Sequence, residues 1–295
     1  MTKTPTLVYA LSLSLVSIAT LPAQSPGEGG GPPKVVQIIR EEVKPGKGAA
    51  HAKVEAGWPR AFAKAKWPTH YLAMTSMSGP SEAWFLIGYP SMAAWEQDNQ
   101  NSEKATALTA QLDQLSARDG ELLSNTRGVV ATYIDSLSYK PHVDMPTMRY
   151  FQVLTFRVRP GHESDFMQAA KMFRTAYEKA KDLPAAWATY RVDFGMPGPV
   201  YLVFIPAKSL EEMDQHPAQD KAFGEAMGAE NWKALNKIAA DSYVNVESNL
   251  FALSPKMSYP PTEFAARDPD FWTPKALAVA KMSSMTPRDT TKRDK

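Results

Sequence analysis

The sequence predicts an α+β fold made of two tandem βαββαβ units, and three observations lead to this prediction. An apolar run that stops at Val, a basic residue and Pro-Gly occurs twice, at residues 43–46 and 158–161. Other segments match one another in the same order, at an offset of about 115 residues. Each copy also alternates runs of β-favouring residues with stretches of helical period. An ordered series of matches at a nearly constant offset indicates an internal duplication.

The matching segments extend through both copies. In chain order they are Gln37 with Gln152, AFAKAK (61–66) with AYEKAK (176–181), Tyr71 with Trp187, WFLIGYP (84–90) with VYLVFIP (200–206), SMAAWEQ (91–97) with SLEEMDQ (209–215), and SLSYK (136–140) with ALSPK (252–256). The small changes of offset along this series have the size of loop insertions.

Both copies give the same order of elements. The first copy is expected to hold strands at 35–43, 70–77, 83–89 and 128–137, with helices at 47–66 and within 91–124. The second copy is expected to hold strands at 149–158, 186–194, 200–205 and 243–252, with helices at 162–181 and within 209–241. Each first strand ends at the Pro-Gly turn, and each third strand ends at a proline that cannot donate to a sheet.

The first strand of the second copy carries apolar side chains on both faces. Tyr150, Leu154 and Phe156 alternate with Phe151 and Val153. A four-stranded sheet can pack one face on its helices, so the other face needs a second sheet. We therefore expect the two copies to face each other as a barrel-like core within one chain.

The β-α-β-β-α-β order is that of the ferredoxin-like unit, and the chain resembles the dimeric α/β-barrel superfamily over residues 34–255. The resemblance is carried by Val43–Lys47 with its copy Val158–His162, and by EAWFLIGYPSMAAWEQ at 82–97. It is similar in style to the antibiotic-biosynthesis-monooxygenase-like and NIPSNAP-like branches. The resemblance implies an intramolecular dimeric α/β barrel formed by tandem duplication.

The domain boundaries follow from the repeat and from the composition of the chain ends. The expected segments are a signal peptide (1–23), a linker (24–33), a first unit (34–138), a linker (139–147), a second unit (148–255) and a C-terminal tail (256–295). Residues 7–19 are apolar, follow Lys3, and are too few for a membrane span of about 20 residues. A buried N-terminal helix is the alternative. We expect a periplasmic or secreted protein, with Phe271 and Trp272 able to latch the tail to the body.

Composition and motifs exclude several classes of function. The net charge is +2 and charges of both signs are interspersed, so nothing indicates a nucleic-acid partner. The chain has no Cys, which excludes disulfides, thiolate nucleophiles and thiolate metal sites. It also has no G-x-S-x-G elbow, phosphate loop or dinucleotide fingerprint.

The five histidines were the natural candidates for metal ligands. No two of them have the i, i+4 spacing of a helical metal site, and no acid cluster accompanies them in the sequence. We therefore expect no metal site and no cofactor. The histidines are His51, His70, His142, His162 and His216.

A candidate ligand wall lies at the second strand of each copy. His70 and Tyr71 open that strand in the first copy, and Ala186 and Trp187 take their places in the second. Either Tyr71 and Trp187 fill the core, or they line a ligand site with His70 as a polar handle or catalytic base.

Three polar strand residues are further candidates for ligand binding. Gln37 and Gln152 occupy matched positions among apolar residues, where each needs a hydrogen-bond partner. They can bond each other or the backbone, or one can polarise a ligand. Arg191 has Asp193 two residues further on. It is either a salt-bridged structural residue or the holder of an anion in a pocket.

Trp84 begins a third strand and is the last candidate. The resemblance implies a comparison with haem-degrading monooxygenases of the superfamily, which combine an Asn, a Trp and a His. Trp84 matches the Trp, but Gln37 stands in place of the Asn and no His follows in the next helix. In the second copy His216 follows the strand, but Val200 replaces the Trp. The triad is incomplete in both copies.

These observations lead to three hypotheses. The first is an exported protein that binds a small, largely apolar ligand in the cleft of the first unit. The second is a cofactor-independent monooxygenase-like enzyme that acts there on a small aromatic substrate, with His70 as base. The third is an assembly role for the exposed tail. We expect no stable membrane insertion after leader removal, and either a monomer or a homodimer.

Overall fold

The computed structural model describes residues 31–180, 183–214 and 216–273. Its strands form one closed antiparallel barrel in the order β1-β3-β2-β8-β5-β7-β6-β4. The strands are β1 (Val35–Val43), β2 (Tyr71–Ser76), β3 (Glu82–Tyr89), β4 (Leu123–Tyr133), β5 (Tyr150–Val158), β6 (Ala188–Phe194), β7 (Val200–Ala207) and β8 (Tyr243–Leu253). The expected α+β class is confirmed, and the expected barrel-like core is a closed antiparallel barrel of eight strands.

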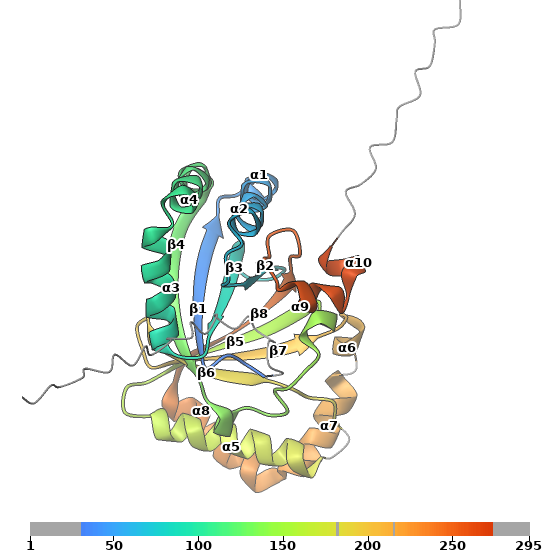
Figure 1. Cartoon of the computed structure of the whole chain (residues 1–295). Coiled ribbons are helices and arrows are strands. Elements are labelled where there is room, and N and C mark those ends of the chain that lie inside the picture. The colour runs from blue at the N-terminus through green and yellow to red at the C-terminus, as the bar shows by residue number, and fades with distance from the viewer. Residues whose placement is uncertain (1–30, 181–182, 215, 274–295) are drawn as a thin grey trace, which may run out of the picture.

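The helices lie outside the barrel in two groups on opposite sides (Figure 1). The first group is α1 (Gly48–Glu55), α2 (Gly57–Ala65), α3 (Met92–Lys104) and α4 (Thr106–Gly120). The second group is α5 (Glu163–Lys179), α6 (Glu211–Asp214), α7 (His216–Met227) and α8 (Ala229–Ser242). The helix expected at 47–66 is therefore two helices, and each long helical region is also divided. Among the described residues, no helix has the length and apolar character needed to cross a membrane.

The two halves of the barrel have the same strand order. Strands β1–β4 lie in the order β4-β1-β3-β2, and strands β5–β8 lie in the order β8-β5-β7-β6. The pairs β2–β8 and β4–β6 join the halves and close the barrel. Each half thus supplies one four-stranded sheet with one group of helices on its outer face (Figure 1).

The interior of the barrel is a packed apolar core. Alternate residues of all eight strands belong to one buried cluster, in which Trp84 and Phe251 bring the two halves together with ring centroids 4.8 Å apart. Strands of small barrels fill their interior with side chains in this way. Side chains therefore fill most of the barrel interior, and a small cavity of about 70 Å³ remains beside Val36, Leu86 and Tyr190.

The end of the described chain packs onto this core. Helices α9 (Thr262–Ala266) and α10 (Pro269–Trp272) place Phe264 and Trp272 in the barrel cluster. The Trp272 indole N–H donates to the Pro146 carbonyl at 2.8 Å. Arg149 pairs with Asp268 and lies over the Phe271 ring at 3.9 Å. The segment thus holds the body through both aromatic residues of DFWTP. Residues 1–30 and 274–295, with the expected signal peptide, lie outside the described chain.

The strand register corrects one match between the copies. Trp84 pairs with Arg40, three residues before Val43. The residue three before Val158 is Thr155, and Thr155 pairs with Leu202. Leu202 rather than Val200 therefore takes the position of Trp84. Single-sequence matching missed this because the β6–β7 hairpin is two residues longer than the β2–β3 hairpin: Leu72 pairs with Leu86, whereas its counterpart Ala188 pairs with Phe204.

Candidate functional site

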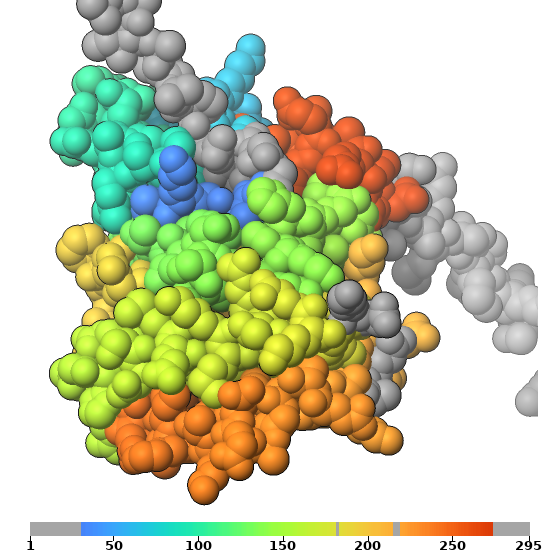
Figure 2. Space-filling model, turned by 90° about the horizontal axis from the view of Figure 1, so that it is seen from below, coloured from blue at the N-terminus to red at the C-terminus, as the bar shows by residue number. Residues whose placement is uncertain are grey.

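A cavity of about 530 Å³ lies in the second half, between the outer face of the sheet and helices α5 and α8. Figure 2 shows this side of the molecule, where α5 (yellow-green) and α8 (orange) cover the sheet. Much of the wall is apolar and includes Phe156, Phe166, Ala170, Trp187 and Ala239. The volume lies within the range of about 300–1,000 Å³ that is common for small-molecule sites.

A few polar groups line the same cavity. The Gln152 amide donates to the Ser248 hydroxyl at 2.9 Å. The Trp187 indole N–H and the Thr189 hydroxyl both donate to the Leu137 carbonyl, at 2.8 and 2.9 Å. These contacts fix the side chains against the sheet. The cavity thus combines an apolar wall with a small set of positioned polar groups, as ligand sites do.

The matching layer in the first half holds ionisable side chains beside an apolar cluster around Tyr71 and Phe85. Glu41, His51, Glu55 and Asp119 are all buried, and the last three are each 2% exposed. His51 Nε2 lies 2.9 Å from Glu41 Oε2 and 3.7 Å from Asp119 Oδ1. One nitrogen or oxygen from each of the four residues lies within 4.8 Å of the others. We call these four residues the carboxylate–histidine cluster.

Three elements bring the cluster together. Glu41 points to the helix side of β1, since it alternates with residues that face the barrel interior. His51 and Glu55 are four residues apart on α1 and therefore share one face of that helix. Asp119 lies at the end of α4, which packs against α1. The cluster therefore depends on the tertiary fold as well as on local spacing.

Burial changes the protonation of the cluster. Loss of solvent, followed by the nearby charges of Glu41 and Asp119, raises the pKa of Glu55 from 4.5 to about 9. Burial and the charge of Glu41 raise the pKa of Asp119 to about 6, against the opposing effect of His51. Burial, then the charges of Glu55 and Glu41, raise the pKa of the Tyr71 phenol well above its usual value. In the protein alone, Glu55 is therefore neutral at pH 7.

The carboxylate–histidine cluster and the cavity occupy matching places in the two halves. The first strands of the two halves align at their Pro-Gly turns. The ends of the last helices align through one hydrogen bond that occurs in both halves: Lys44 N–H donates to the Leu122 carbonyl, and Arg159 N–H donates to the Ser242 carbonyl. With these alignments Glu41, His51, Glu55, Tyr71 and Asp119 correspond to Phe156, Phe166, Ala170, Trp187 and Ala239. All five counterparts line the cavity. The first half therefore has buried ionisable residues at the positions where residues of the second half line a cavity.

The structure separates the residues expected to form one ligand wall in the first unit. Tyr71 faces the helices, in a cluster with Phe85, whereas Trp84 faces the barrel interior. The sheet lies between them. His70 Nδ1 lies 3.2 Å from the Tyr259 carbonyl oxygen, and its ring lies 4.5 Å from the Tyr259 ring.

The other expected site residues fall in different places. Gln152 and Trp187 both line the cavity of the second half. Gln37 accepts from the Tyr89 hydroxyl at 3.5 Å on the helix side of β1. Arg191 is exposed and pairs with Asp193 at 2.9 Å. Gln37 and Gln152 make these contacts in separate halves.

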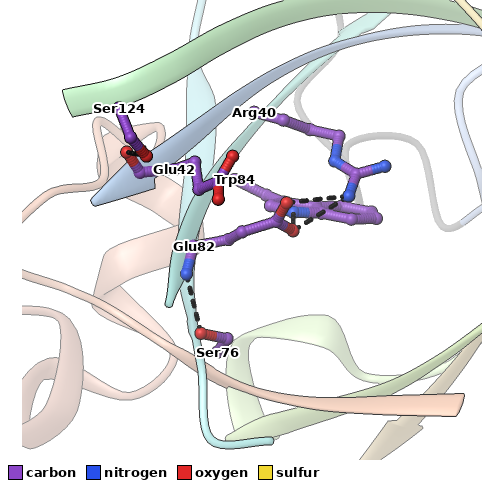
Figure 3. A network of polar contacts seen from close by, with 6 residues as sticks. All are labelled: Arg40, Glu42, Ser76, Glu82, Trp84 and Ser124. Atoms are coloured by element: carbon purple, nitrogen blue, oxygen red, sulfur yellow. Dashed lines mark hydrogen bonds and ion pairs between the residues drawn. The ribbon is translucent and has the colours of Figure 1, made fainter. Parts of the chain in front are cut away.

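A closed polar network surrounds Trp84 at one end of β3 (Figure 3). Arg40 Nη2 donates to both oxygens of the Glu82 carboxylate at 2.9 and 3.0 Å, and Trp84 Nε1 donates to Glu82 Oε2 at 2.7 Å. The Arg40 guanidinium also lies over the Trp84 ring at 4.3 Å. These mutual contacts hold Trp84 in the core, as a structural network does.

The expectation that no acid cluster accompanies the histidines is wrong for His51. Two signals were present in the sequence: Glu55 stands four residues after His51, and Glu41 lies on the strand immediately before that helix. The spacing between histidines does not reveal a cluster that contains one imidazole and three carboxylates. Asp119 joins only through tertiary packing, 68 residues after His51.

Known proteins give limited help. No protein-family model and no curated protein matches the chain. Among solved structures, an anthrone oxidase-like protein shares 13% identity over 75% of this chain and 92% of its own, with a TM-score of 0.49. A Lactobacillus acidophilus protein with a provisional monooxygenase name shares 7% identity over 74% of this chain and 93% of its own, with a TM-score of 0.46. A mutant chlorite dismutase from Candidatus Nitrospira defluvii shares 10% identity over 80% of this chain and 95% of its own, with a TM-score of 0.45. The barrel architecture therefore rests on this chain's own strand pairing.

Proposed function

We propose that this is an exported binding protein for a small, largely apolar ligand, held in the cavity of the second half. The observation that carries the proposal is the cavity of about 530 Å³ with its apolar wall and few polar groups. The site differs from the expected cleft of the first unit, where the matching layer holds the carboxylate–histidine cluster.

We further propose that the two halves are tandem copies of one ferredoxin-like unit. Their identical strand order and their matched Pro-Gly turns support a common origin. After duplication, one copy could acquire a cavity between its sheet and its helices while the other copy kept this layer packed.

The lining indicates the kind of ligand. The Trp187 ring lies 5.0 Å from the Tyr139 ring and 5.2 Å from the Tyr177 ring, so an aromatic group stands at one wall. Gln152 and Asn236 supply amides on the sheet side and the helix side. The ligand we propose has an aromatic or aliphatic body and one or two hydrogen-bonding groups.

The test compares two neighbouring residues on α8. Ala239 lines the cavity, and Ala240 is exposed. We expect Ala239→Phe to weaken binding of the probe 1-anilinonaphthalene-8-sulfonate at least about tenfold, measured by fluorescence titration. Ala240→Phe adds the same ring outside the cavity and should bind as the wild type does. Equal binding by the two variants would overturn the proposal.

Native mass spectrometry of exported material gives a second, independent check. A small molecule that co-purifies with the wild type and is absent from Ala239→Phe supports the cavity as the site. The monooxygenase-like alternative needs a base beside the ligand. His70 lies in the first half beside Tyr259 and is not part of the cavity wall, so the geometry favours binding.

A further inference from the structure

The carboxylate–histidine cluster takes no part in the proposed ligand site. It lies on the other side of the barrel, between β1 and helices α1 and α4. Protein interiors hold ionisable groups of this kind only when other groups stabilise them. The cluster therefore needs an explanation of its own.

We propose that Glu41, His51, Glu55 and Asp119 bind one divalent first-row metal ion. The donor set is one imidazole nitrogen and three carboxylates. Bonds of about 2.1 Å to one ion place such ligand atoms roughly 3–4 Å apart. The four atoms already lie within 4.8 Å of one another, so small side-chain rotations bring them around one ion.

Tyr71 supplies an observation from outside the cluster. Its hydroxyl is buried with no hydrogen-bond partner, and the residue is only 7% exposed. Tyr71 lies on the helix side of β2 and packs in one cluster with Ile39 of β1 and Ala52 of α1, the residue next to His51, and the nearby acids Glu55 and Glu41 help to raise the pKa of its hydroxyl. Buried polar groups are nearly always satisfied by protein, water or an ion. An unpartnered hydroxyl at this position indicates a missing ligand, which a metal ion with a bound water would supply.

Two carboxylate oxygens of the cluster are also unsatisfied. Glu55 Oε1 and Asp119 Oδ1 are buried and lack a hydrogen bond of normal geometry; their nearest polar neighbours are the Trp58 indole N–H, which lowers the pKa of Glu55, and His51 Nε2, which lies 3.7 Å from Asp119 Oδ1. Each leaves a lone pair directed away from water, at a cost in stability. Coordination to one cation satisfies both oxygens and offsets the mutual repulsion of the three acidic groups.

The donor set narrows the choice of metal. Carboxylates suit Mg²⁺, Ca²⁺ and Mn²⁺, whereas imidazole suits Zn²⁺ and Fe²⁺. A site with both is best matched by Mn²⁺, Fe²⁺ or Zn²⁺. The second half replaces all four ligands with apolar residues, so we expect one ion per chain, in the first half.

The test uses the full chain, purified without a metal-affinity step from cells grown with added MnCl₂. Because the cluster is buried, loading during folding gives the ion its best access. Elemental analysis should find Mn²⁺, Fe²⁺ and Zn²⁺ at a total of about one ion per chain. Electron paramagnetic resonance should show the Mn²⁺ as bound. A folded protein with a total below about a tenth of an ion per chain overturns the proposal.

Matched variants identify the ligands. Glu55→Gln keeps the shape of the side chain and replaces the carboxyl group with an amide, which is a weaker metal ligand, so the variant is expected to fold, which circular dichroism checks. Its metal content should fall at least about tenfold, as should that of His51→Gln. The control is His162→Gln, which removes a partly exposed His–carboxylate pair with Asp165 and should keep its metal. Retention of metal by both cluster variants, or equal loss in the control, overturns the assignment.

The metal proposal and the binding proposal can fail separately. Ala239→Phe should keep its metal while it loses the fluorescent probe. Glu55→Gln should lose its metal while it keeps the probe.

Discussion

The layer between sheet and helices differs between the two halves of this molecule, although the strand order is the same. In the first half the layer holds four buried ionisable side chains. In the second half the matching positions are apolar and border a cavity of about 530 Å³. Buried charge and empty space both lower stability compared with a well-packed apolar layer. Departures from good packing are expected at functional sites, and here the two halves depart in opposite directions.

Replacing His51 by Phe, the residue type at the matching position 166, should have the largest effect on this comparison. His51 Nε2 lies 2.9 Å from the Glu41 carboxylate and 3.7 Å from that of Asp119. The change leaves both acids buried beside an apolar ring. Removal of one partner from a buried pair costs about 3–5 kcal/mol. Urea denaturation should show a loss of this size in the free energy of unfolding.

The control for that experiment is His162→Phe on the second half. His162 Nδ1 lies 2.7 Å from Asp165 Oδ2, and both side chains are partly exposed. An exposed pair contributes less than about 1 kcal/mol. Equal losses in the two variants would show that burial of the carboxylate–histidine cluster is not what distinguishes the halves.

Metal removal should produce the next largest effect. An ion present at 100 times its dissociation constant stabilises the folded state by about 2.7 kcal/mol. We expect the wild type refolded with a chelator to melt at a lower temperature than the same protein refolded with Mn²⁺. Glu55→Gln should melt at the same temperature under both conditions. Calorimetry that finds no difference for the wild type would contradict the metal site.

A pair of Ala→Leu changes tests packing in the two halves. Ala61 on α2 is 1% exposed, and it is not among the residues that line the cavity. Ala61→Leu should destabilise the protein by about 1–3 kcal/mol through overpacking. Ala170 lines the cavity, so Ala170→Leu should stabilise the ligand-free protein by about 0.5–1 kcal/mol. Thermal unfolding of both variants gives the sign of each change, and a loss of stability for Ala170→Leu would contradict the presence of open space beside Ala170.

Much of the fold could be predicted from the sequence because the strands are locally encoded. The run at 35–43 is apolar and ends in Pro-Gly, and β1 has these bounds in the structure. The exact match of the third strands could not be predicted, because the hairpins differ in length and apolar residues align equally well at either register. Only the pairing of Trp84 with Arg40 and of Leu202 with Thr155 fixes it.

The site was harder to predict than the fold. Gln152 and Trp187 were named as candidate ligand-binding residues, but the expected cleft was in the first unit, whereas both residues line the cavity of the second half. The cavity itself depends on how far α5 and α8 lie from the sheet, which no local pattern records. Asp119 could not be assigned to His51 from spacing, since the two meet only when α4 packs on α1. Local sequence therefore predicts the strands, whereas tertiary packing determines where the buried ionisable residues and the cavity lie.

Arg191 should show the smallest effect, and it tests how far the ligand site extends. Its side chain is 58% exposed and pairs with Asp193 at 2.9 Å. It also lies two residues from Thr189, on the same face of β6, and Thr189 lines the cavity. If the pair is only structural, Arg191→Gln changes the free energy of unfolding by less than about 0.5 kcal/mol and leaves probe affinity unchanged. A loss of affinity for the sulfonate probe, without a matching loss for an uncharged analogue, would instead show that Arg191 binds the anionic group of the ligand. The second half would then carry a charged residue at the edge of its cavity, whereas the first half carries its ionisable residues in the buried cluster.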